Sequence, residues 1–252
     1  LLLSSVASIL LDMAMEVGAW VHVDGAFGLW AAASPNTSYL AKGMEKADSW
    51  CADGHKTLNT PYDCGIVLCK HMDALKEAMA ASGSYIVSGG SEHRDNMFYS
   101  PDMSRRSRGV DLWVSLRYLG REGVAELVDG LVSRAKEFGD KLQLVTLVDA
   151  DLVELYGRGS VFTVVNDIVF NQCMVRCNTP EETARTLVHI QSCGVTWCGG
   201  ATWENQFVIR ISVCSWATTT NDVTTVVEVF SDAYQQVVAE MAEEAREIGV
   251  EC

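Results

Sequence analysis

The chain has 252 residues, of which 48% are hydrophobic and 21% charged, so it is long enough to bury the core of one large domain or of two modest ones. Its formal net charge of −14 argues against nucleic-acid binding, because the sequence contains no basic stripe to neutralise phosphates. The nine cysteines include no C-x-x-C pair, which leaves zinc-ribbon and thioredoxin-like sites without support and favours reduced cysteines in a cytoplasmic protein.

The beginning of the sequence is apolar over residues 1–11 and turns polar at Asp12. This stretch is too short to span a bilayer, and no basic region precedes it as in a signal peptide, so no membrane partner is expected. The first residue is not Met, and we interpret the start as a position inside a longer protein.

The first half of the sequence alternates helical and strand-like segments. The predicted elements are a buried helix over residues 1–18, a strand that ends at Asp24, a short helix over 36–46, and strands over 47–53 and 65–70. Such short alternating units are typical of an α/β fold with a largely parallel sheet. Ligands of these sheets bind where strands end. Because Asp24 and the pair His55-Lys56 both follow apolar strands, a functional site is expected at this edge.

Residues 82–109 interrupt the alternation, since they are rich in glycine and serine, charged and aperiodic. Long loops of this kind in a compact domain are often functional lids. A helical pattern follows from Val110 to about Gln143, and we place the domain boundary at its start. Residues 1–110 are then predicted to belong to a large α/β domain, and residues 111–252 to form a small α+β domain.

The second half contains a further set of strands and helices. The predicted elements are strands over 151–156 and 161–177, a helix over 180–192, a strand hairpin over 195–214, and an amphipathic helix over 220–247 with Thr220 or Asn221 as its N-cap. This order is typical of a small α+β domain.

Two motifs make the sequence recognisable. HVDGAFG, which contains Asp24, is followed by ADSWCADGHKTLNTPYDCG, which contains Lys56. With them the chain resembles the group II pyridoxal-5′-phosphate (PLP)-dependent amino-acid decarboxylases of fold type I, a family that includes glutamate and aromatic amino acid decarboxylases, in an N-terminally truncated form. The resemblance continues through SRRSRGVDLWVSLRYLGREG, NQCMVRC and VIRISVCSWATT. It implies the C-terminal part of a PLP-binding large domain, aspartate aminotransferase-like, followed by a small α+β C-terminal domain.

The resemblance also implies roles for residues of both motifs. Lys56 is expected to carry PLP as an imine, and Asp24 to keep the pyridine nitrogen protonated. Ala26 is expected to lie against the ring, and His55 near the phosphate. His22 shares a strand face with Asp24, and it either orients that carboxylate or serves packing alone. Without the resemblance the pair would be weak, because many α/β proteins have an Asp and a Lys at strand ends.

Three further positions bear on the reaction. Tyr85 matches the family's mobile-loop tyrosine, which can relay a proton to the substrate carbon after CO₂ leaves and favours decarboxylation, since members that deaminate oxidatively tend to have Phe there. Arg105, beside Arg106 and Arg108, resembles the family's arginine cluster and is a weaker candidate for the substrate carboxylate. Asp53 departs from the family pattern: the glutamate and aromatic branches usually have Asn, which contacts the phosphate. A carboxylate would repel that group, so a different contact or none is expected.

These expectations combine into a functional prediction. The chain should decarboxylate an L-amino acid to the amine and CO₂ with PLP, as a homodimer without a metal. Another PLP reaction, such as transamination or aldehyde formation, would use the same Lys56 and Asp24. A third hypothesis is a catalytically incomplete protein that acts as an interaction or regulatory partner, because the family's ring-stacking histidine and much of its phosphate loop would precede Leu1. The sequence does not specify the substrate.

Overall fold

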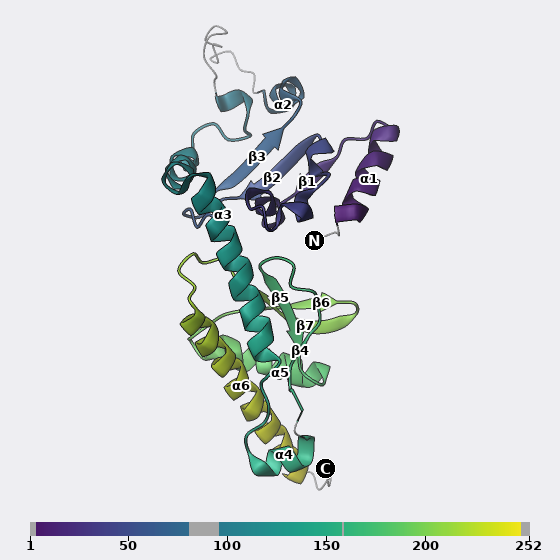
Figure 1. Ribbon diagram of the computed structural model, residues 1–252, viewed down its shortest axis with the longest axis vertical. Helices are drawn as coiled ribbons and strands as arrows, with labels where there is room; N and C mark the ends of the chain where they lie inside the picture. The colour runs from purple at the N-terminus through teal and green to yellow at the C-terminus, as the bar shows by residue number, and fades with distance from the viewer. Residues whose placement is uncertain (1–3, 81–95, 158, 248–252) are drawn as a thin grey trace. The chain divides into compact units, whose positions relative to one another are not determined.

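The computed structural model describes residues 4–80, 96–157 and 159–247 (Figure 1). Its contacts divide the chain into two compact units, residues 1–128 and 129–252, and each unit is described by itself. The division falls inside α3 (Arg108–Leu142), which is interrupted at Gly120 by a non-helical backbone with φ 64° and ψ −173°, whereas the sequence predicts a domain boundary at residue 110. The assignment of a large and a small domain with that boundary stays a prediction.

The first unit is built on a three-stranded sheet in the order β1-β2-β3. Its elements are α1 (Ser4–Glu16), β1 (His22–Asp24), η1 (Gly28–Ala33), η2 (Ser38–Ala41), η3 (Met44–Lys46), β2 (Ser49–Asp53), β3 (Gly65–Cys69), α2 (Met72–Met79), η4 (Asn96–Phe98) and the start of α3. β1 pairs parallel with β2, but β2 pairs antiparallel with β3. The expectation of a largely parallel sheet is therefore wrong for β3. The reason is the connection: a crossover through 3-10 helices joins β1 to β2, whereas a helix-free turn joins β2 to β3.

Two local expectations for this unit need correction. The helix α1 ends before Gly18, which has the left-handed φ of 65°, but it is not buried all round: Leu11 is buried, while Ile9 and Leu10 are exposed. The helix expected over residues 36–46 is instead the two short 3-10 helices η2 and η3. Gly43, with a φ of 92°, separates them.

The second unit has a four-stranded antiparallel sheet in the order β4-β5-β7-β6. Its elements are α4 (Ala150–Tyr156), β4 (Thr163–Val164), β5 (Gln172–Arg176), α5 (Pro180–Ser192), β6 (Gly199–Trp203), β7 (Gln206–Ser212), α6 (Thr220–Glu247) and the end of α3. The helix α5 packs against β7 and against α6. The predicted helices over 180–192 and 220–247 and the predicted hairpin are confirmed.

The strand predicted over residues 151–156 is wrong, because this segment forms α4. Asp149 caps the helix: its carboxylate accepts hydrogen bonds from the backbone N–H groups of Asp151 (2.9 Å) and Leu152 (3.1 Å), which satisfies two donors that a helix start otherwise leaves free. The strand predicted over 161–177 is two strands, β4 and β5, with a loop between them.

The N-cap of α6 is Thr219 rather than the predicted Thr220 or Asn221. The Thr219 hydroxyl accepts from the backbone N–H of Asp222 (3.3 Å), and the Asp222 carboxylate accepts from the backbone N–H of Thr219 (2.8 Å). This reciprocal pair has the geometry of a capping box, here with Asp in place of the usual Glu or Gln. The pKa of Asp222 is lowered by the hydrogen bonds that its carboxylate accepts from the hydroxyl (2.7 Å) and from the backbone N–H of Thr219.

The core of the second unit is aromatic. Phe230 is fully buried and meets Phe138 and Phe162 edge to face, at ring-centroid distances of 5.4 Å and 5.8 Å. Tyr234, also fully buried, donates its hydroxyl hydrogen to the Glu182 carboxylate at 3.0 Å. Burial and the adjacent Glu182 carboxylate raise the pKa of Tyr234, so the phenol remains a donor. This bond supplies a partner for a carboxylate that is 4% exposed.

An ion-pair cluster joins α5 to α6. The Arg185 guanidinium donates to both carboxylate oxygens of Glu244 (2.9 Å and 2.7 Å) and to Glu240 (3.3 Å), and Glu240 also lies 3.3 Å from His189. The hydrogen bond from Arg185 lowers the pKa of Glu244. The folded chain therefore favours the charged carboxylate more than the unfolded chain does.

This cluster predicts a pH-dependent stability. Because the folded pKa of Glu244 is depressed, its stabilisation is present above the ordinary pKa of 4.5 and is lost as the pH falls through the folded value. We expect Arg185→Met to lower the Tm of the second unit at neutral pH, and the difference from wild type to shrink near pH ~3. Thermal unfolding followed by circular dichroism at both pH values measures this. An equal difference at the two pH values would contradict the assignment.

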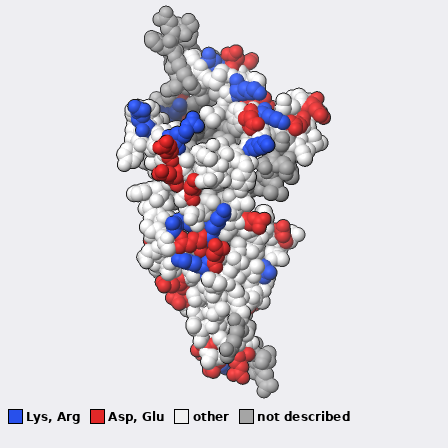
Figure 2. Space-filling model, in the orientation of Figure 1, with Lys and Arg blue, Asp and Glu red and all other residues white. Residues whose placement is uncertain are grey.

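On the face that Figure 2 shows, acidic and basic side chains lie intermixed. The eight described cysteines are free, and burial raises the pKa of the Cys173, Cys177 and Cys198 thiols to about 12. Within the three described segments, no helix has both the length and the apolar character that a membrane crossing needs.

Candidate active site

The two sequence motifs meet where β1 and β2 end. Asp24 and Cys51 are partners in the parallel register, and backbone hydrogen bonds continue past the strands. The N–H of Gly25 donates to the carbonyl of Cys51 (3.0 Å), and the N–H of Asp53 donates to the carbonyl of Ala26 (3.1 Å). The turn that contains Asp24 and Ala26 therefore lies directly beside the start of the turn that leads to Lys56, at the carboxyl edge where α/β sheets bind ligands.

The Lys56 amine lies between an anion and an aromatic ring. Its Nζ is 2.8 Å from Oδ2 of Asp53 and 4.8 Å from the centroid of the Phe27 ring, a cation–π arrangement. Phe27 belongs to the turn after β1, so this contact joins the two strand ends. The Lys56 side chain is 28% exposed and remains accessible to a small molecule.

The Asp24 carboxylate is held from two sides. Its Oδ1 accepts from the backbone N–H of Ala26 (3.3 Å) and from the thiol of Cys51 (3.4 Å). His22, by contrast, lies 2.8 Å from the hydroxyl of Ser49 through its Nδ1. Of the two roles considered for His22, these contacts support packing rather than the orientation of Asp24.

His55 connects the Lys56 turn to the residues that follow it. Its Nδ1 accepts from the backbone N–H of Cys64 (3.0 Å), so in the neutral ring the proton is on Nε2. That Nε2 lies 3.6 Å from Oδ2 of Asp53, and the ring packs 4.0 Å from that of Tyr62. A place beside a cofactor phosphate stays a prediction for His55.

Asn59 shapes the same turn and was not identified from the sequence. It adopts a left-handed φ of 53°, and its side-chain amide donates to the carbonyls of Lys56 (2.8 Å) and Thr57 (3.2 Å). Asn tolerates this conformation better than most residues. An Asn three residues after the lysine is the signal that could have indicated it.

Gly25 is required by a close approach. A Cβ at this position would lie 2.5 Å from the Cβ of Leu29 and 2.9 Å from the carbonyl oxygen of Cys51. A residue with a Cβ therefore does not fit this backbone at position 25.

We expect Gly25→Ala to destabilise the first unit by about 1–3 kcal/mol, because η1 must move away from β2. Gly109→Ala is the matched control: beyond its own turn of helix, nothing lies within 4 Å of its added Cβ, and alanine in a helix should stabilise by up to about 1 kcal/mol. Urea unfolding followed by tryptophan fluorescence measures both variants. A Gly25→Ala protein as stable as the control would refute the close approach.

The arginine cluster divides into two groups. Arg105 donates to the hydroxyl of Ser100 and to the carbonyl of Asp102 (3.0 Å), so it folds back on its own segment. Arg108 binds both carboxylate oxygens of Asp63, at 2.7 Å and 3.1 Å, and Arg106 donates to the Asp63 carbonyl (3.2 Å). The hydrogen bond from Arg108 lowers the pKa of Asp63. These two arginines thus hold the turn between β2 and β3, while a substrate contact for Arg105 stays a prediction.

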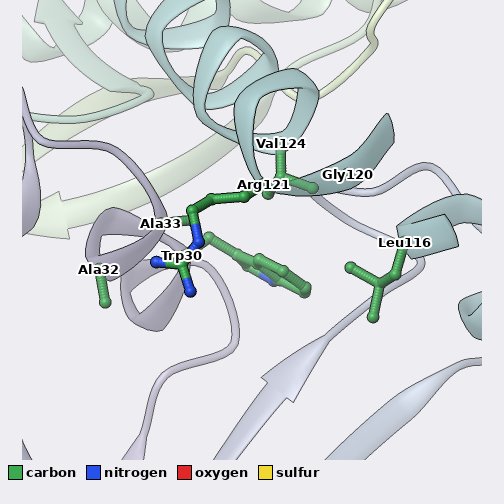
Figure 3. Close-up of a pocket in the computed structure, with 7 residues that line it drawn as sticks. All are labelled: Trp30, Ala32, Ala33, Leu116, Gly120, Arg121 and Val124. Atoms are coloured by element: carbon green, nitrogen blue, oxygen red, sulfur yellow. The ribbon is translucent and has the colours of Figure 1, made fainter. Parts of the chain in front are cut away.

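A hollow of about 350 Å³ lies in the same unit (Figure 3). It is lined by Trp30, Ala32, Ala33, Leu116, Gly120, Arg121 and Val124. Figure 3 shows the Arg121 side chain extending toward Trp30. The Trp30 indole N–H donates to the backbone carbonyl of Asp53 (3.1 Å), which connects this wall to the Lys56 turn.

The residues present fit part of a PLP site. An accessible lysine amine and a carboxylate on the neighbouring strand end are the two groups that the aldehyde and the pyridine nitrogen need, and Ala26 adds a small side chain in the same turn. The Asp53 carboxylate would repel a phosphate, in line with its departure from the family pattern. Tyr85 lies outside the described residues. Among those residues, no group of three or more His, Cys, Asp or Glu side chains could hold a metal ion.

Comparison with known proteins decides the family. The profile of the pyridoxal-dependent decarboxylase conserved domain matches residues 5–148. The chain belongs to this family. It is 31% identical over 132 residues to tyrosine/DOPA decarboxylase 5 of Papaver somniferum, a match that covers 51% of this chain and 25% of that one. It is 32% identical over 126 residues to 4-hydroxyphenylacetaldehyde synthase of Rhodiola rosea, over 50% and 26% of the two chains.

The fold also matches a solved structure. The structure of Oryza sativa TDC with PLP and tryptamine superposes with a TM-score of 0.79 at 22% identity, over 92% of this chain and 48% of that chain. The predicted fold class, α/β of the PLP-dependent fold type I, is confirmed. The chain spans about half the length of that structure, and the segments matched in the curated relatives are shorter still.

Proposed function

We propose that this chain is part of a PLP-dependent amino-acid decarboxylase, in which Lys56 binds the cofactor covalently and Asp24 holds its pyridine nitrogen in the protonated form. The observation that carries the proposal is the pairing of the two strand ends through the hydrogen bond from Asp53 N–H to the Ala26 carbonyl (3.1 Å). This hydrogen bond brings the turn that contains the Lys56 amine beside the turn that contains Asp24. Membership of the family supports the same assignment.

Each residue has a defined task in this proposal. When bound, PLP supplies an electron sink for the pair of electrons that CO₂ leaves behind. Lys56 would hold the cofactor covalently through its amine. Asp24 would hold the pyridine nitrogen in its protonated form, and Ala26 would leave one ring face uncrowded. Tyr85 is the proposed proton donor to the substrate carbon, and Arg105 a weaker candidate for the substrate carboxylate.

Aldehyde formation is a second candidate. The relative from Rhodiola rosea is named an aldehyde synthase, and it matches this chain as well as the decarboxylase from Papaver somniferum does. Both reactions would use Lys56 and Asp24. Tyr85, rather than Phe, is the residue that favours the amine as product.

Product analysis of the purified protein loaded with PLP separates these candidates. Aromatic L-amino acids are the first substrates to test, because the relatives' names include tyrosine, DOPA and aromatic amino acids, and L-glutamate serves as a comparison. Equal amounts of CO₂ and amine support the proposal, whereas CO₂ with an aldehyde favours the second candidate. Covalently loaded protein that releases no CO₂ from any L-amino acid would overturn both. We further propose that the protein is a cytoplasmic homodimer. Light scattering of the purified protein would test the dimer.

A further inference from the structure

Asp53 has a contact that its departure from the family pattern does not explain. Its Oδ2 lies 2.8 Å from the Lys56 amine and 3.6 Å from Nε2 of His55. The Asp53 side chain is 22% exposed and that of Lys56 28%, so the pair is largely shielded from water. A partly shielded ion pair of this length restrains a flexible lysine more than a surface pair does.

The backbone of Asp53 is fixed independently of its carboxylate. Its N–H donates to the carbonyl of Ala26 (3.1 Å), and its carbonyl accepts from the Trp30 indole (3.1 Å). The backbone of Asp53 is therefore held by both of these hydrogen bonds, and its carboxylate contacts Lys56 from this fixed position. The Phe27 ring also faces this amine, with its centroid 4.8 Å from Nζ of Lys56.

We propose that Asp53 is a positioning residue for Lys56: its carboxylate holds the lysine ammonium at the carboxyl edge whenever the amine is not bonded to the cofactor. A long side chain released by the substrate amine would otherwise sample many rotamers, which costs entropy when it must return. This inference deepens the proposed function and rests on it for its catalytic meaning. The ion pair itself can be tested without the cofactor.

Competitive acylation with trace acetic anhydride, followed by peptide mass spectrometry, reports how readily each lysine amine reacts. We expect Asp53→Asn to raise the acylation rate of Lys56 about two- to fivefold, the range of a measurable ion pair. The pair of Lys46 with Asp12, at 2.6 Å on the same unit, is the matched control. Lys46 should be unchanged in Asp53→Asn, and Asp12→Asn should accelerate Lys46 without affecting Lys56.

Salt and charge distinguish positioning from a general structural role. At about 1 M salt the effect of Asp53→Asn on Lys56 should narrow less than the effect of Asp12→Asn on Lys46, because a partly buried ion pair is screened less than an exposed one. Asp53→Glu keeps the charge and should react at close to the wild-type rate. An Asp53→Asn protein with the wild-type circular dichroism spectrum and an unchanged Lys56 rate would overturn the proposal. So would Asp53→Glu reacting as fast as an unpaired lysine.

Two assays of the same protein distinguish failure of this inference from failure of the proposed function. The acylation assay contains no PLP, so it gives the same result whether or not Lys56 binds the cofactor. Borohydride trapping of PLP on wild-type protein is the second arm. If borohydride traps PLP on the protein but Asp53→Asn leaves the acylation rate of Lys56 unchanged, only the inference is refuted. If Asp53→Asn changes that rate but no adduct is trapped, only the proposed function is refuted.

Discussion

Replacing Asp24 by Asn is expected to lower the rate of CO₂ release by about 100- to 1000-fold, the effect of removing one preorganised electrostatic contact from an active site. An amide carries no charge to keep the pyridine nitrogen protonated. Its oxygen can still accept from the Ala26 N–H and the Cys51 thiol, as Oδ1 of Asp24 does, so the fold should persist. Initial rates of CO₂ release from the loaded protein measure the change.

Two controls make this prediction specific. Asp12→Asn removes a carboxylate of the same unit that pairs with Lys46, and it should leave the rate unchanged. Borohydride should still trap the cofactor on Lys56 in Asp24→Asn, because the amine is intact. A rate within tenfold of wild type would show that Asp24 does not hold the pyridine nitrogen.

Replacing Phe230 by Ala should destabilise the second unit by about 3–5 kcal/mol, the usual cost of a large cavity in a packed core. The ring is fully buried and contacts Phe138 and Phe162 edge to face, so its removal leaves a cavity beside these two rings. Urea unfolding followed by circular dichroism measures the loss. Val188→Ala, at a side chain that is 63% exposed, should change stability by less than about 0.5 kcal/mol. If Phe230→Ala lowers the free energy of unfolding by less than the loss of a single buried methyl group does, this core is not closely packed.

The sequence predicted the helices whose signals are local. In α5, Thr179 caps the backbone of Glu182 and Pro180 occupies the first turn, and both signals lie within four residues of each other. The segment 151–156, DLVELY, was misassigned although its apolar residues come in adjacent pairs three residues apart, a spacing of helices rather than the alternation of a strand. A strand also needs a partner, and partners are chosen by residues far away in the chain. Here the cap at Asp149 provides a local alternative, and the helix forms.

The sequence predicted those parts of the site that depend on residues close together in the chain. The motifs placed Asp24 and Lys56 at strand ends, and the parallel register of β1 and β2 brings these ends together. The contact of Asp53 with Lys56 depends on rotamers that no spacing encodes. The bond from the Trp30 indole to the Asp53 carbonyl joins positions 23 residues apart, and nothing in the order of residues indicates it.

The central claim, that Lys56 is the residue that binds PLP, is tested most directly by locating the covalent adduct. The purified protein is incubated with PLP, reduced with borohydride and digested, and every lysine-containing peptide is weighed by mass spectrometry. Lys56→Ala is the companion sample, and Lys46, which is similarly ion-paired, serves as the internal reference. The account predicts a reduced adduct on Lys56 that is absent from the variant, with Lys46 unmodified at the same PLP concentration. An adduct on another lysine, an even spread over many lysines, or no adduct at all would contradict it.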